Sequence, residues 1–80
     1  MIKEKHIAKI PDNYATNNQI WIAIVPHISN NEVVGFYLNT YEDLTMDSIF
    51  DTWFKELGYA KEAALEDFGI KESDWKKIAF

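Results

Sequence analysis

Residues 49–69 read IFDTWFKELGYAKEAALEDFG, and the fold depends on how this stretch divides between strand and helix. The apolar residues of its second half share one helical face: Leu57, Ala60, Ala64 and Phe68. The charged residues between them fall on the other side of the same helix, which is the pattern of an amphipathic helix. We therefore predict a helix over 57–68, and Gly69 is suited to the C′ position that ends it.

The first half of the stretch and the residues before it are ambiguous. Periodicity alone favours a helix, because apolar residues recur at helical spacing: Met46, Ile49, Phe50, Trp53 and Leu57. Thr45 could cap such a helix. Composition favours a short strand instead, because residues 49–54 are rich in β-branched and aromatic side chains. Local rules leave both alternatives open.

Two segments resemble a family of small uncharacterised bacterial acidic proteins. They are GFYLNTY at 35–41 and FDTWFKELGYAKEAALEDFGIKESDW at 50–75. The family pattern has a GFYL strand, then Asp-Thr-Trp, a His or Phe, and a helix of the form Leu-x-x-Ala-Lys-x-x-Ala that leads into Phe-Gly-Ile. The resemblance implies that 51–53 close a strand and that the helix begins near Glu56. On this basis we predict a strand over 49–54. The family shares no known activity, so the resemblance implies a fold and not a function.

Three further strands are predicted upstream, over 2–10, 19–28 and 33–42. The first alternates polar and apolar residues, as a strand with one solvated face does. The second contains IWIAIV at 20–25, which is apolar on both faces and typical of a central strand. The turn-forming residues 11–18 separate the two.

The second and third strands form a hairpin whose register the sequence leaves open. If the turn consists of Asn30 and Asn31, simple counting pairs Val25 with Phe36. A change of one residue in this count would exchange the two faces of the third strand. Pro26 lacks an amide hydrogen, so the pairing must lapse or bulge near it.

These elements predict one small α+β domain spanning 1–80. An antiparallel sheet of about four strands is covered on one face by the helix 57–68. A C-terminal helical turn is predicted over 72–78, with Trp75 and Ile78 folding back onto the sheet.

Charge is distributed unevenly along the chain. The formal net charge is −5, the first forty residues are neutral overall, and the chain has no arginine. This composition argues against nucleic-acid binding, which depends on lysine and arginine. No run reaches the eighteen or so apolar residues of a membrane span, no signal peptide is recognisable, and cysteine is absent. We expect a cytoplasmic, bacterial protein without membrane association.

The sequence contains no arrangement of residues that is typical of a catalytic site. His6 and His27 are the only histidines, and the hydroxyls of Thr16, Ser29 and Ser48 have no base placed near them by sequence. None of the standard nucleophile, phosphate-binding or zinc motifs is present. We expect a protein that is not an enzyme and that needs no cofactor or metal.

Carboxylates recur every four residues at Asp43, Asp47 and Asp51, beside Glu42. Three interpretations are open: a solvated turn between strands, an acidic patch that binds a partner, or a site for a hard cation. Two interpretations are also open for four aromatic residues that could share one face of the sheet: Trp21, Tyr37, Tyr41 and Trp53. That face could be part of the core, or it could be an exposed binding patch.

The leading hypothesis is a non-enzymatic protein that masks a basic, toxin-like partner, as immunity or antitoxin proteins do. The expected binding residues are Tyr37, Tyr41, Glu42, Asp43, Asp47, Asp51 and Trp53. The acids would steer lysines or arginines while the aromatics supply contact area. One alternative is a homo-oligomeric module, such as a homodimer, that pairs through the uncovered sheet face or an edge strand. Another is a small enzyme or ligand-binding protein that uses His6 or His27 with a carboxylate.

Overall fold

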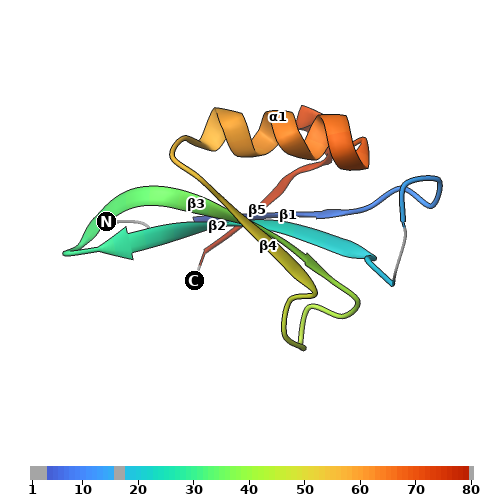
Figure 1. Ribbon diagram of the computed structural model, residues 1–80, viewed down its shortest axis with the longest axis horizontal. Helices are drawn as coiled ribbons and strands as arrows, with labels where there is room; N and C mark the ends of the chain where they lie inside the picture. Colours follow the sequence, from blue (N-terminus) through green and yellow to red (C-terminus); the bar gives the residue numbers. More distant parts are fainter. Residues whose placement is uncertain (1–3, 16–17, 80) are drawn as a thin grey trace.

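A five-stranded antiparallel sheet with one helix across it forms the molecule (Figure 1). The structure is a computed structural model that describes residues 4–15 and 18–79. Its elements are β1 (Glu4–Lys9), β2 (Trp21–Ser29), β3 (Glu32–Tyr41), β4 (Phe50–Phe54), α1 (Leu57–Phe68), a 3-10 helix (Glu72–Asp74) and β5 (Lys76–Ala79). The predicted α+β fold is confirmed, and the predicted helix has the observed bounds.

The strand order in the sheet is β4-β3-β2-β1-β5, so β4 and β5 are its edges. Along the sequence, α1 follows β4 and precedes β5. The chain therefore leaves one edge of the sheet, crosses it as a helix and returns at the opposite edge. Figure 1 shows α1 over one face and the loop 42–49 projecting on the other side. One face of the sheet is thus covered by helix, and the opposite face is not.

The core lies between α1 and the even-numbered residues of the first three strands. Ile22 and Ile24 are fully buried, and they cluster with Ala60 and Ala64 of α1. The two alanines let the helix backbone approach the sheet closely, while the isoleucines fill the space beneath it. Thr40 is also fully buried there and accepts a hydrogen bond from the Gln19 side chain at 3.1 Å.

Residues 50–54 are a strand, which decides the ambiguity in favour of the alternative that composition favours. β4 pairs with β3 over five residues, from Phe36 opposite Phe54 to Thr40 opposite Phe50. The helical spacing of the apolar residues was misleading, because Met46 and Ile49 are exposed in the loop and at its end. Pairing with a strand already in the sheet outweighs a weak local preference.

The hairpin turn is the predicted Asn30–Asn31 pair, but the counted register is wrong beyond Ile28. Both asparagines have positive φ, as this tight turn requires. A bulge between His27 and Ile28 adds one residue to β3, so Val25 pairs with Tyr37 and not with Phe36. The bulge is next to Pro26, where a lapse in pairing was expected. Its consequence is that Tyr37 faces away from α1.

The C-terminal prediction is wrong for residues 76–78, which form a strand and not a helical turn. Only Glu72–Asp74 is helical, and β5 pairs with the outer edge of β1. Trp75 packs against the core as expected, whereas Ile78 lies on the opposite face of the sheet. The three-residue spacing of Trp75 and Ile78 resembles a helical turn, but a partner strand far away in the chain decides the structure. The predicted strand residues 2 and 3 lie outside the described residues.

The end of α1 confirms the role predicted for Gly69. Its φ is 68°, and its amide donates to the carbonyl of Leu65 at 3.0 Å. Ile70 donates to the carbonyl of Ala64 at 3.2 Å and is 1% exposed. The bond from the Gly69 amide to the carbonyl four residues earlier is that of an αL ending, and the buried Ile70 adds an apolar side chain at this end of the helix. A Cβ at position 69 would also stand 2.6 Å from the ring of Tyr14.

Candidate functional site

The face of the sheet opposite α1, called here the open face, carries odd-numbered residues of β1 to β4 and Lys76 and Ile78 of β5. One row of directly paired residues crosses all five strands: Lys76, Ile7, Ala23, Asn39 and Asp51. The row begins with an ammonium and ends with a carboxylate. Its centre is apolar, with Ile7 and Ala23 buried among their neighbours.

All four aromatic residues singled out in the sequence lie on the open face. Trp21 pairs with Tyr41, and Tyr37 pairs with Trp53. Trp53 is 45% exposed and Tyr37 is 36% exposed, whereas the other two are half-buried. Helix packing cannot account for this clustering, because α1 lies on the other side of the sheet.

Trp53, Tyr37 and His27 form an aromatic cluster near the β2–β3 turn. The indole N–H of Trp53 donates to Nδ1 of His27 at 3.1 Å, and the rings of His27 and Tyr37 are 5.2 Å apart. Gly35 lies under the indole, and a Cβ at that position would overlap the ring. The glycine therefore provides the space in which Trp53 lies flat against β3. Sequence reasoning considered His27 only as a catalytic or ligand-binding residue and did not single out Gly35. It expected a lapse in pairing near Pro26, but not that the extra residue of β3 would bring these two residues beneath Trp53.

The acidic arm comprises residues 37–54, which are most of β3, the loop 42–49 and β4. It contains four acids and no lysine. Asp51 is on the open face, whereas Glu42 and Asp47 are exposed in the loop. Asp43 accepts hydrogen bonds from the backbone and hydroxyl of Thr45 at 2.9 and 2.8 Å. These bonds hold the pKa of Asp43 below its usual value, so this carboxylate remains charged. All the expected binding residues therefore belong to one continuous arm.

Lysines stand at the other side of the open face. Lys9 of β1 and Lys76 of β5 are both exposed, and within the described residues neither forms an ion pair. The acidic arm is at the β4 edge and these lysines are at the β5 edge. The open face is consequently polarised across the strands, from negative to positive. The sequence shows that the acids are concentrated in the second half of the chain. It does not show this polarity, because Lys9 and Lys76 come together only when β5 pairs with β1, which is distant in the sequence.

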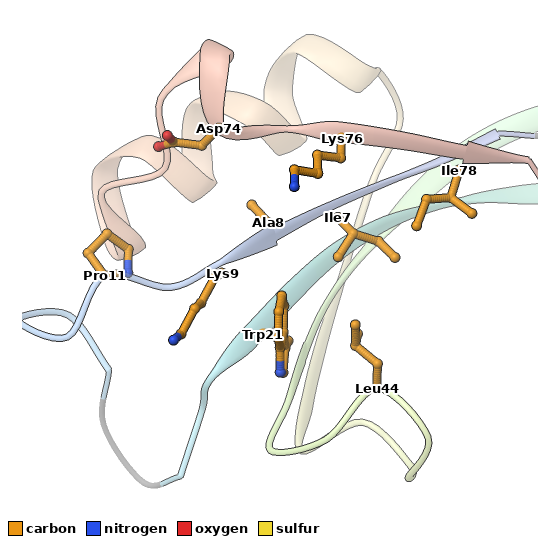
Figure 2. A pocket seen from close by; sticks show the side chains of 9 residues that line it. All are labelled: Ile7, Ala8, Lys9, Pro11, Trp21, Leu44, Asp74, Lys76 and Ile78. Atoms are coloured by element: carbon orange, nitrogen blue, oxygen red, sulfur yellow. The ribbon is translucent and has the colours of Figure 1, made fainter.

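A pocket of about 530 Å³ lies beside the start of β5 (Figure 2). Leu44 from the acidic arm lies near Trp21 and Ile7, and Lys9 and Lys76 also line the pocket (Figure 2). The remaining lining residues are Ala8, Pro11, Asp74 and Ile78. The pocket joins the acidic loop to the lysine side of the open face and extends its apolar surface.

The residues considered for catalysis do not come together. His6 is 7% exposed and lies beneath α1, while His27 is on the open face. Burial, followed by the positive charges of Lys61 and Lys77, lowers the pKa of His6 and favours its neutral form. Ser29 ends β2 and Ser48 is in the loop 42–49, and within the described residues no hydrogen bond joins either to a histidine. Thr16 lies outside the described residues.

The arrangement offers no metal cluster in the part of the chain that the structure describes. No group of three or more His, Asp or Glu side chains there is placed to hold an ion. The acids of the arm are distributed over the loop 42–49 and β4. Asn39, which pairs with Asp51, donates a side-chain hydrogen bond to the hydroxyl of Tyr41 at 3.2 Å. The amide oxygen of Asn39 is buried without a hydrogen-bond partner among the described residues.

Comparisons with known proteins give no information on the function of this chain. The chain matches no family model, no curated protein and no solved structure. Over residues 4–15 and 18–79, no helix combines the length and apolar character needed to cross a bilayer.

Proposed function

We propose that the chain is a non-enzymatic binding protein whose acidic arm and open face mask a basic partner protein. The observation that supports this most is the joining of exposed aromatic rings and carboxylates on one arm. Trp53 and Tyr37 are large, exposed and next to Asp51, on the face of the sheet opposite α1. Aromatic residues dominate binding hot spots, and carboxylates steer and pair with basic side chains.

The mechanism is occlusion of the partner's surface. The loop 42–49 projects from the sheet (Figure 1), and its acids Glu42, Asp43 and Asp47 are exposed, so they meet an approaching cationic surface first. Tyr37 and Trp53 then supply the contact area from which water is expelled. Gly35 and His27 hold the indole flat and restrict its rotation, so less conformational entropy is lost on binding. Immunity and antitoxin proteins neutralise basic partners in this manner.

Capture of a partner from the native organism tests this proposal. The tagged chain is compared with a triple variant in which Asp43, Asp47 and Asp51 become Asn. We expect the original chain to retain a basic protein at low salt and to release it at high salt, because exposed ion pairs are screened. The triple variant is expected to lose this capture.

The chain offers a matched control on its helical side. Glu62→Gln, Glu66→Gln and Asp67→Asn remove the same charge from α1, whose exposed acids face away from the sheet. This control is expected to capture the partner as the original chain does. If both triple variants lost the basic protein equally, capture would depend only on net charge. If both retained it equally, or if the original chain captured no basic protein, binding through the acidic arm would be contradicted.

A further inference from the structure

We infer that the open face also pairs with the open face of a second copy of this chain, about a two-fold axis parallel to β2. This inference goes beyond the proposed function, because the partner is the chain itself. It rests on the polarity of the open face and on its register, which together determine how two copies fit.

Symmetry determines which residues meet. A two-fold axis along the central strand exchanges the two sides of the sheet, so β4 of one copy faces β5 of the other. In the row centred on Ala23, Asp51 at one end then lies opposite the partner's Lys76 at the other. The same contact occurs a second time with the roles exchanged. Within the described residues, neither Asp51 nor Lys76 forms an ion pair in its own chain.

The apolar residues agree with the same axis. Two residues further along the strands, Trp53 is the open-face residue of β4 and Ile78 is the matching residue of β5. These side chains are 45% and 44% exposed, and the axis places each opposite the other across the interface. Val25, half-buried on β2, meets the partner's Val25 on the axis. Burial of these side chains supplies the association energy, and the ion pairs select the orientation.

The alternative two-fold axis, perpendicular to the strands, is disfavoured by charge. That axis would place β4 over β4 and β5 over β5. The carboxylates of the two acidic arms would then face each other, as would Lys76 and its copy, and like charges at an interface are costly.

Sedimentation of the full-length chain from about 1 µM to 1 mM tests the pairing. We expect the mass to rise from monomer to dimer over this range, as for a small interface. Asp51→Lys and Lys76→Asp are each expected to weaken the dimer at least about tenfold, because each introduces two repulsive contacts. An equimolar mixture of the two variants is expected to restore it as a heterodimer, since every contact is then again between opposite charges.

Glu66→Lys on the exposed side of α1 is the control, and it is expected to leave dimerisation unchanged. A chain that stays monomeric up to 1 mM would overturn the inference. A dimer that ignores both charge reversals, or a mixture that stays dissociated, would overturn this interface. Lys76→Asp keeps the whole acidic arm, so its capture of a basic protein tests the proposed function separately. Failure of one proposal therefore leaves the other to be judged by its own measurement.

Discussion

Replacing Ile24 by alanine is expected to lower the free energy of unfolding by about 3 kcal/mol. Ile24 is fully buried on β2, and it packs in the cluster that includes Leu38 and the two buried alanines of α1, Ala60 and Ala64. Truncation removes three methylene-sized groups and leaves a cavity that a close-packed core cannot fill completely. In a domain of this size, such a loss lowers the melting temperature by about 12–24 °C. Thermal and urea unfolding of the two proteins measure it.

Val25 is the matched control, because it is the next residue of the same strand and points the other way. It lies half-buried on the open face and pairs with Tyr37. Val25→Ala is expected to cost about 1 kcal/mol, since fewer atoms are removed and they are partly solvated already. Equal losses at the two positions would contradict the assignment of one face to the core and the other to binding.

Replacing Trp53 by alanine is expected to weaken association through the open face at least about thirtyfold, which corresponds to about 2 kcal/mol. The side chain is the largest exposed apolar group of the aromatic cluster, and it is prepositioned by Gly35 and His27. Its removal costs the fold one hydrogen bond and the packing of the indole on Gly35, together about 2 kcal/mol. Sedimentation gives the change in association, and urea unfolding gives the change in stability.

Tyr59 provides the control for Trp53. It is a similarly exposed aromatic residue, 55% exposed, but it lies on α1 at the opposite side of the molecule. Tyr59→Ala is expected to leave both dimerisation and partner capture unchanged. If it weakened association as much as Trp53→Ala does, association would depend on general exposed hydrophobicity and not on the open face.

Local signals predicted the helix and the turn. The amphipathic stripe gave the observed bounds 57–68, Gly69 ended the helix as expected, and Asn30–Asn31 formed the hairpin turn. These features depend on residues close together in the chain, so spacing and φ preferences are sufficient to predict them. The expectation that the aromatics share one face is also consistent with the register.

The features that sequence missed depend on contacts between distant residues. β5 has only four residues, and its strand character comes from the edge of β1 some seventy residues away. The bulge at His27 moved Tyr37 to the open face by adding one residue to the count. The polarity of that face arises because β5 brings Lys76 to the edge opposite Asp51. No local pattern encodes which strands become the two edges of a sheet.

The central claim is that the open face is a protein-binding surface, and the three tryptophans test it most directly. Trp21 and Trp53 are on the open face, whereas Trp75 packs on the helical side near His6. Indole N–H resonances of the ¹⁵N-labelled chain can be followed as unlabelled chain is added. We expect the signals of Trp53 and Trp21 to shift with concentration while that of Trp75 stays constant. Shifts confined to Trp75, or no shift in any indole up to about 1 mM, would contradict the pairing of two copies through the open face.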